Sequence, residues 1–379
     1  MRTAIVAAAA TLALTASSVG AQGALSLQGL GYPSGGLSAR AEGTGGALAD
    51  FDALSVVAPA ALARAGASAI FFQYSPEFRK VTTSSGSAST TTARFPMVVG
   101  VLPLGQSWTL GLSSSSFLDR SSETNLTREL IVGAPTDTVI VTERNRVLGA
   151  INDVRLALGW SKSALFRVGV GAHVFTGSNR ITFSQLFPDS TRYTSTTQSG
   201  RISYAGMAAS AGFELHPSRV IGFAFAGRKG GDLRAESGDT AIGKAKLPDH
   251  YSASVIFEGI SGALISARVA HDSWSSLSAL SSSGIQAFDG WDTGVGVEAS
   301  GPRILQRIVT LRLGGRFRTL PFGLNGEKVS ENAFSAGFGF PLARERASFD
   351  FAAQRASRTA GSDIKERGYI LSFGLRVSP

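Results

Sequence analysis

Apolar and polar residues alternate along much of this chain, with the period of two that is typical of a β-strand with one apolar face. In the last segment, the apolar positions are Tyr369, Leu371, Phe373, Leu375 and Val377. The pattern recurs in segments 154–160, 166–174, 205–215, 251–257, 263–269, 291–297, 309–317, 334–340 and 347–353. A soluble β-sandwich alternates too. These segments are about ten residues long, however, which is the length that a tilted strand needs to cross a bilayer.

The connections between these segments alternate between short and long. Short turns are expected near 103–106, 161–164, 215–218, 258–262, 299–306 and 341–345. Long polar loops are expected near 76–93, 118–145, 177–199, 229–248, 273–287, 319–330 and 357–366. Six short turns and seven long loops make fourteen strands, with both termini of the predicted barrel on the short-turn side. This asymmetry is typical of outer-membrane barrels, so we predict an all-β, 14-stranded antiparallel transmembrane β-barrel.

Aromatic residues stand where the two membrane interfaces are expected. Aromatic rings at the ends of the predicted strands suggest two girdles, formed by Trp108, Trp160, Trp274, Trp291, Tyr251 and Tyr369. The first two strands, near 66–75 and 94–102, are apolar on both faces. We therefore expect an apolar element to cover them from inside the barrel.

The beginning of the chain divides into two parts. Residues 1–21 read as a secretory signal peptide, because a short apolar run after Arg2 ends in small residues; a retained anchor helix is the alternative. Residues 22–64 do not alternate and are rich in glycine and alanine, which suggests a small plug folded into the lumen; a periplasmic linker is the alternative. Residues 65–379 form the predicted barrel.

Composition limits the function further. The chain contains no Cys, which excludes disulfides, thiol catalysis and cysteine-based metal sites. Beyond the predicted signal, no apolar run is long enough for a transmembrane helix. The net charge of +9 could indicate a nucleic-acid partner, but the basic residues are scattered and the chain is expected to be exported, so none is predicted. The 45 glycines suit strands with small residues on a polar lumenal face.

Several segments resemble the FadL/TodX-type outer-membrane transporters of hydrophobic compounds, whose broader relatives include PorV-like barrels. Segment 38–50 resembles the Gly/Ala-rich plug of this family, and Leu247-Pro248 resembles a motif that leads into a mid-barrel strand. Ala58-Pro59-Ala60 stands where the family usually carries Asn-Pro-Ala, so the expected plug residues are Ala58, Pro59 and Ala60. Segments 313–318 and 336–340 resemble late strands.

The resemblance implies passive transport. The implied partners are outer-membrane lipids, a small hydrophobic ligand and the machinery that assembles outer-membrane barrels, and the implied location is the outer membrane of a Gram-negative-type bacterium. A monomer is expected, without a cofactor. The predicted function is a channel for passive uptake of small hydrophobic compounds, fatty-acid-like or aromatic. The alternative is a non-transporting barrel that serves as a docking or assembly partner for a secretion system.

Charged residues fall on the faces that are expected to point inward. An arginine can bind a carboxylate with two hydrogen bonds, so a lumenal site for an acidic head group is one interpretation. A structural network of paired charges is the other, and we favour it. The candidate ligand-binding residues are Arg312, Arg316, Arg167, Arg268 and His173.

The remaining polar motifs indicate no other chemistry. None of the four histidines has metal-ligand spacing, so no metal site is predicted. His271 followed by Ser273 permits a hydrolase reading, but triads are defined by geometry and adjacent strand residues face opposite ways. We therefore predict no catalytic residues and no enzyme.

Overall fold

The computed structural model describes residues 25, 29–83, 86–131, 138–189, 191–280, 285–304, 306–324, 326–342, 346–361 and 364–379. The predicted signal peptide, residues 1–21, lies outside these described residues. The first strand begins at Ala69, and the predicted boundary between residues 64 and 65 remains a prediction.

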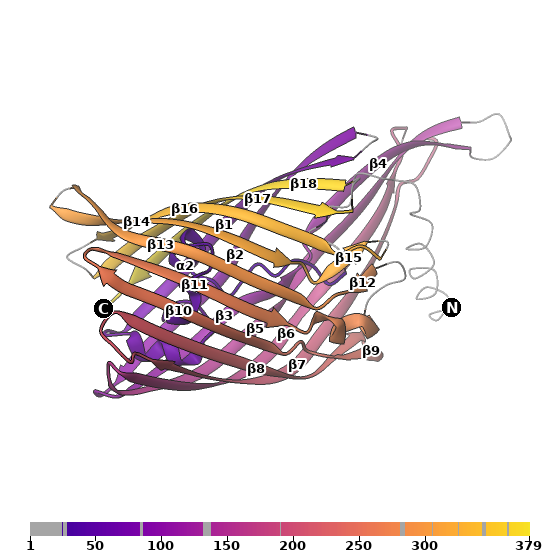
Figure 1. Ribbon diagram of the computed structural model, residues 1–379. Helices are drawn as coiled ribbons and strands as arrows, with labels where there is room; N and C mark the ends of the chain where they lie inside the picture. Colours follow the sequence, from indigo (N-terminus) through magenta and orange to yellow (C-terminus); the bar gives the residue numbers. More distant parts are fainter. Residues whose placement is uncertain are drawn as a thin grey trace.

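Long antiparallel strands dominate the structure (Figure 1). The first half of the barrel contains β1 (Ala69–Thr83), β2 (Gly86–Leu104), β3 (Trp108–Asp119), β5 (Thr138–Ser163), β6 (Phe166–Leu186), β7 (Thr196–Leu215) and β8 (Ile221–Ser237). The second half contains β10 (His250–Ile260), β11 (Ala263–Asp272), β13 (Gly290–Ile304), β14 (Arg307–Thr319), β16 (Val329–Leu342), β17 (Ala347–Ala360) and β18 (Ile364–Val377). Five short elements are not members of this ring of strands: β4 (Ser122–Ile131), β9 (Thr240–Lys246), β12 (Ile285–Ala287), β15 (Phe322–Leu324) and the 3₁₀ helix η4 (Trp274–Leu280).

The sheet closes on itself. Strand β1 pairs with both β2 and β18, and β8 pairs with both β7 and β10, so neither strand leaves a free edge in the ring. Within the described ranges, fourteen strands form this closed antiparallel barrel, which confirms the predicted fold class. Strand β4 pairs with a part of β5, and β9 with a part of β8, that project beyond the ring. We call the end of the barrel where they project the long-loop end. The opposite end, where the C-terminus lies, is the turn end (Figure 1).

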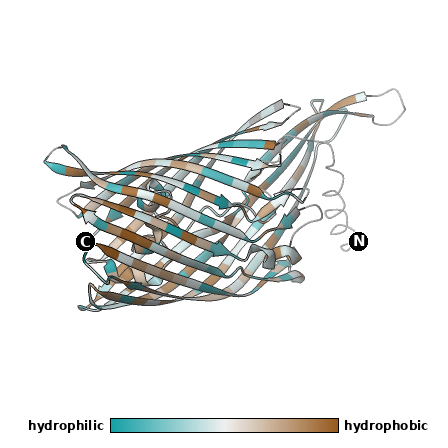
Figure 2. Cartoon of the chain, in the orientation of Figure 1, coloured by the Kyte–Doolittle hydropathy of each residue, from teal (hydrophilic) through white to brown (hydrophobic). Residues whose placement is uncertain are grey.

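The two faces of the wall differ in chemistry, as the alternation predicts. On β14, Leu313 is 65% exposed on the outer face, whereas its neighbour Arg312 is 5% exposed and faces the lumen. Figure 2 shows the same banding of apolar and polar positions around the barrel. Large apolar side chains therefore cover the outside of a closed sheet, and no second sheet formed by the described residues packs against them. This is the arrangement of a barrel that faces lipid.

This arrangement gives a direct test on the outer face. We expect Leu313→Arg to cost about 2–4 kcal/mol of barrel stability, because it places a charge on the lipid-facing side in the middle of a strand. Urea titration of the barrel in lipid vesicles measures this loss. Leu313→Phe is the matched control and should change stability little. Equal stability of the two variants would contradict a lipid-facing position.

The expected long loops are largely strand. Segments 76–93, 118–145, 177–199 and 229–248 were expected as loops. Most of their described residues instead belong to the hairpins β1–β2, β4–β5, β6–β7 and β8–β9. Segments 76–93 and 177–199 are rich in serine and threonine, and threonine favours extended backbone. Continued strand pairing also satisfies the backbone hydrogen bonds of these segments. The polarity of the segments alone did not show that they are paired strands and not loops.

The aromatic girdles are partly as expected. Trp108 and Trp160 are cross-strand partners at the turn end, with ring centroids 6.3 Å apart, and Trp291 is 61% exposed on the outer face. The assignment of Trp274 to a girdle is wrong. Trp274 begins η4, is only 5% exposed, and packs inside the barrel, because the chain turns inward after β11.

An N-terminal segment fills the turn-end half of the lumen, and we call its residues 29–66 the plug. It contains the short helix α2 (Ala39–Gly43) and the 3₁₀ helices η2 (Ala49–Phe51) and η3 (Pro59–Arg64) (Figure 1). Helix α2 contacts β14, β16, β17 and β18, whereas η3 contacts β3, β5, β6 and β7. No helix in the part of the chain that the structure describes has the length and apolar character to cross a bilayer.

The plug packs directly against the backbone of the wall. A Cβ atom at Gly314 would overlap the plug backbone at Thr44 and Gly45, and a Cβ at Gly169 would overlap the backbone of Pro59. Gly45 itself has φ of +65°, a conformation that glycine adopts without strain. Glycine residues on the inner face therefore allow the plug and the wall to pack closely.

The two-sided apolar strands are covered as predicted. On the inner face of β1 and β2, Phe71 and Val99 are fully buried and belong to one cluster with the plug residues Val56 and Leu62. On the outer face, Ile70 is exposed. The prediction that an apolar element covers these strands from inside is confirmed.

Candidate functional site: the lumenal cavity and its neighbours

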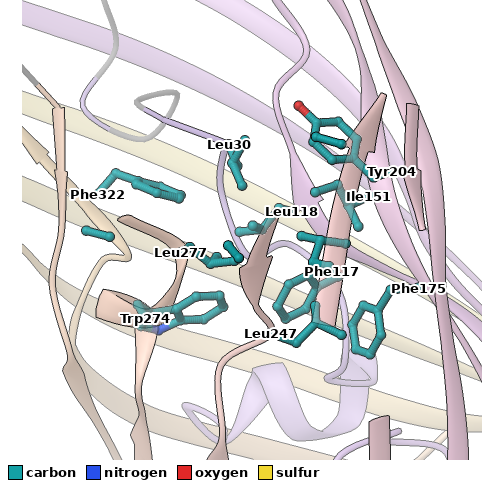
Figure 3. Packing of buried hydrophobic residues seen from close by; sticks show 14 residues of the cluster. Leu30, Phe117, Leu118, Ile151, Phe175, Tyr204, Leu247, Trp274, Leu277 and Phe322 are labelled. Atoms are coloured by element: carbon teal, nitrogen blue, oxygen red, sulfur yellow. The ribbon is translucent and has the colours of Figure 1, made fainter. Parts of the chain in front are cut away.

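Buried apolar side chains form a cluster in the lumen, and Figure 3 shows how they pack together. The cluster joins Phe117 and Phe175 on the wall with Trp274 and Leu277 of η4 and with Leu30 of the plug. Phe117 packs edge-on to Phe175 at 4.8 Å between ring centroids and stacks on Trp274 at 5.4 Å. We call this the outer apolar cluster. The cluster places apolar surface inside a barrel whose other lumenal side chains are mostly polar.

A cavity of about 110 Å³ lies between the outer apolar cluster and the plug. Phe117 and Trp274 belong to both the cluster and the cavity wall, and the plug contributes Leu37 and Val57. The charged residues that line it are Asp153, His173, Arg228, His250, Arg268, Asp272, Asp292, Arg316 and Arg318. The cavity thus has an apolar side and a charged side, which suits a molecule with both characters.

An ion pair and two hydroxyl hydrogen bonds hold the plug against the wall at Asp50. The carboxylate of Asp50, in η2, accepts hydrogen bonds from Arg268 at 3.1 Å, Ser252 at 3.1 Å and Ser254 at 2.5 Å, and it is fully buried. Three donors compensate the burial of this charge. The predicted ligand residue Arg268 is therefore engaged by the protein's own plug.

A second plug carboxyl lacks such a partner. Glu42, in α2, accepts a hydrogen bond from Gln73 at 3.2 Å. Burial raises the pKa of the Glu42 carboxyl to about 7, against the opposing effects of a hydrogen bond with Ser372 and of Arg316 and Arg318. The plug therefore contains a carboxyl that titrates near neutral pH.

The N-terminal end of the plug is clamped by arginines. Tyr32 forms two backbone hydrogen bonds with Asp119, both of 2.9 Å. Its ring lies 4.6 Å from the Arg358 guanidinium and 4.9 Å from that of Arg318, and its hydroxyl donates to Glu331 at 3.0 Å. Cation–π and charge-assisted contacts thus fix this part of the plug to the wall.

The predicted ligand residues do not form a single site. Arg316, Arg268 and His173 line the cavity, whereas Arg312 and Arg167 are not among its lining residues. Arg312 lies beneath α2, and Arg167 lies near the turn end beside η3.

Each predicted arginine already has a carboxylate. Arg312 donates to Glu298 at 2.7 Å and to Asp350 at 2.6 Å. Arg316 forms a bidentate pair with Asp292 at 2.8 and 2.6 Å. Arg167 pairs with Glu214. The network of paired charges that we favoured is what the structure contains, and the role of these residues in ligand binding stays a prediction.

Sequence reasoning missed the arginine that has the weakest pairing in the cavity. Arg228 lies 3.9 Å from the nearer oxygen of Asp153, beyond hydrogen-bond reach, and its Nε has no hydrogen-bond partner among the residues that the structure describes. Its guanidinium lies 5.1 Å from the ring centroid of Phe117 and 5.4 Å from that of Phe175. The alternation of Phe223 and Phe225 with small residues along β8 could have placed Arg228 on the inner face.

The expected plug motif lies at the start of η3. Ala58 precedes the helix and is 1% exposed, Pro59 occupies the first turn, and Ala60 is buried. Ala58 makes no side-chain cap hydrogen bond, and backbone contact with Gly169 holds this turn in place. Any specific role of Ala58, Pro59 and Ala60 remains a prediction.

Neither metal ligation nor the proposed pair of His271 and Ser273 has support in this geometry. Among the described residues, no group of three metal-ligating side chains could hold an ion. His271 packs edge-on against Trp291 with ring centroids 4.9 Å apart, on the outer face. The backbone N–H of Ser273 instead donates to the carbonyl of Asp249.

Comparison with known proteins concerns the fold. No family model and no curated protein sequence matches this chain. A FadL homologue from Pseudomonas aeruginosa is similar in structure, with a TM-score of 0.60 and 13% identity over 90% of this chain and 98% of that one. The chain has a FadL/TodX-type fold.

Two other FadL/TodX-type barrels show the same extent of similarity. The toluene transporter TodX from P. putida has a TM-score of 0.56 and 12% identity, covering 90% of this chain and 98% of its own. The monoaromatic hydrocarbon channel CymD has a TM-score of 0.55 and 12% identity, covering 91% and 98%. The similarity spans the FadL/TodX-type barrel as a whole.

Proposed function

We propose that this protein is an outer-membrane channel for passive uptake of small hydrophobic compounds that carry a carboxylate. One observation carries the proposal: Phe117 and Trp274 form part of both the outer apolar cluster and the wall of the charged cavity. An apolar compound gains free energy by leaving water for such a cluster. It can then reach the cavity without crossing water. Structural neighbours that are named as a monoaromatic hydrocarbon channel and a toluene transporter support the hydrophobic part of this proposal.

Arg228 is the proposed anchor for the carboxylate. It faces the cavity, lies beyond hydrogen-bond distance of every carboxylate that the structure describes, and has apolar rings beside it. The candidates Arg312, Arg316, Arg167 and Arg268 would first have to release a partner, which costs free energy. We propose that they hold the plug and wall, whereas Arg228 receives the ligand.

Release requires movement of the plug, because it fills the lumen below the cavity. We further propose that the chain works as a monomer, depends on the outer-membrane barrel assembly machinery, and uses residues 1–21 as its export signal. A barrel that only docks a secretion machine would not need a ligand in this cavity.

Trp274 offers a local test of binding. In a variant that retains only Trp274, brominated octanoate should quench tryptophan fluorescence in a saturable way, because this ring lines the cavity. We expect Arg228→Gln to weaken octanoate binding about 10- to 100-fold, since a hydrogen bond to a charged group contributes about 1.5–3 kcal/mol.

The controls separate charge from apolar contact. Brominated octanol should bind equally to the Arg228→Gln variant and its parent, and Arg201→Gln, at an exposed position on β7, should leave octanoate binding unchanged. Absence of saturable quenching by both compounds would contradict the channel proposal. Equal loss of acid and alcohol binding in Arg228→Gln would contradict the anchor.

A further inference from the structure

Three lumenal side chains on adjacent strands form a continuous hydrogen-bonded chain. The Nδ1 of His173, on β6, lies 2.9 Å from both carboxylate oxygens of Asp153, on β5. Its Nε2 lies 2.8 Å from the Oγ of Ser210, on β7. All three residues are buried and face the lumen. The order carboxylate, imidazole and hydroxyl matches the orienting group, the base and the nucleophile of a catalytic triad.

The hydrogen bonds fix how the imidazole can act. A carboxylate can only accept, so Nδ1 carries the proton that bonds to Asp153. The lone pair of Nε2 then faces the hydroxyl of Ser210 and can accept its proton. This is the tautomer that a general base needs.

A cation lies beside the hydroxyl. Arg228 is the cross-strand partner of Ser210 in the β7–β8 register, and both side chains point inward. Directly opposed side chains have Cβ atoms about 5 Å apart. The Nε of Arg228 has no hydrogen-bond partner within the described part of the chain, so it is available to stabilise negative charge that develops on a substrate oxygen.

The carboxylate and the imidazole of this chain reach the cavity, and Ser210 lies one hydrogen bond behind them. Asp153, His173 and Arg228 line the cavity, whose other side is formed by Phe117 and Trp274. The neighbouring lumenal residue on β6 is Gly171, and a Cβ there would lie only 2.6 Å from Ser210 Oγ. The missing side chain leaves the hydroxyl free to keep its bond to His173.

We propose that Ser210, His173 and Asp153 hydrolyse carboxylic esters of small apolar acids inside the barrel. Ser210 Oγ attacks the ester carbonyl while its proton passes to His173 Nε2, and Arg228 stabilises the oxyanion. The ester C–O bond breaks, and the departing alcohol takes the proton from His173. Water then attacks the acyl group, gives a proton through His173 to Ser210, and releases the acid. Asp153 is a positioning residue throughout.

This activity does not depend on transport, and its test is separate. The full-length protein, folded in detergent micelles, is treated with a fluorophosphonate probe and assayed with p-nitrophenyl butyrate. We expect covalent labelling of Ser210, identified by mass spectrometry. Ser210→Ala and His173→Ala should each lose about 100-fold or more of the hydrolytic rate, the range of a general base and its nucleophile.

Two further variants distinguish catalysis from structure. Gly171→Ala should displace Ser210 Oγ and abolish labelling although no group of the triad is removed, whereas Gly100→Ala, whose nearest contact would be Leu112 O at 3.8 Å, should not. Asp153→Asn should lower kcat about 100-fold with KM nearly unchanged. If Asp153 had only a structural role, the variant would not show a lower kcat with an unchanged KM.

The serine control is Ser113→Ala. Ser113 is another buried lumenal serine, and its Oγ has no hydrogen-bond partner, so its loss should not affect labelling or hydrolysis. Heat-modifiable gel migration verifies that each variant is folded. Failure of the probe to label Ser210 in the folded protein, or full hydrolysis by folded Ser210→Ala, would overturn the proposal.

Discussion

Replacing Gly314 with alanine is expected to force the plug away from the wall of the barrel. The new Cβ would overlap the backbone of Thr44 and Gly45, and backbone atoms cannot move aside as a side-chain end can. Overpacking of this kind costs about 1–3 kcal/mol. On the other face of the same strand, Gly315→Ala would place its Cβ no closer than 3.7 Å to its neighbours, at Phe317, and is the matched control.

Thiol labelling measures this displacement. The chain has no Cys, so a single cysteine at Ala49, which is fully buried in η2, reports plug exposure without background. We expect Gly314→Ala to raise the labelling rate of this cysteine about tenfold or more, since each 1.4 kcal/mol is a factor of ten. Gly315→Ala should leave the rate unchanged. Slow labelling in both variants would mean that close backbone approach does not hold the plug.

The barrel could be predicted from sequence because its signal is local. Whether Leu313 faces lipid depends on its own strand, where Arg312 and Gly314 point the other way, and this period of two is visible without knowing the neighbouring strand. The number of strands followed from the alternation of short and long connections. The extent of β5 and β6 beyond the apolar belt did not, because polar paired strands and polar loops have similar composition.

The interior was harder to predict because it depends on register between strands. Asp153, His173 and Ser210 lie on three strands, and only the pairing of Arg155 with His173 and of Gly171 with Ser210 brings them together. Turn geometry sets that register. The sequence therefore indicated an inward His173 but not its partners.

The girdle prediction for Trp274 was wrong for a similar reason, because its position depends on contacts that are distant in the sequence. Its position after an alternating segment suggested a membrane interface, but the chain folds inward at Ser273 and η4 closes over the lumen. The direction of such a turn depends on packing inside the lumen and cannot be read from the local sequence pattern. The plug is similar: its glycines indicated a non-strand segment, but only the wall shows why Gly45 must lack a side chain.

The second large effect is expected at Arg358. This arginine is fully buried and donates to Glu331 at 2.5 Å and to Glu77 at 2.7 Å, and it also pairs with Glu366. Arg358→Met would leave three buried carboxylates with one cation fewer. Breaking a buried ion pair by removing one partner costs about 3–5 kcal/mol, because the remaining charge is uncompensated. The Tyr32 ring would also lose its cation–π contact at 4.6 Å.

The temperature at which the folded barrel converts to its slower-migrating form on a gel measures this cost, together with urea titration in vesicles. Arg128→Met is the control, since its pair with Glu143 is half exposed and should contribute about 1 kcal/mol or less. Adding Glu366→Gln to Arg358→Met should recover part of the loss, because it removes one of the uncompensated carboxylates. If Arg358→Met were as stable as Arg128→Met, the buried cluster would not hold plug and wall together, and the plug would depend on backbone packing at Gly314 instead.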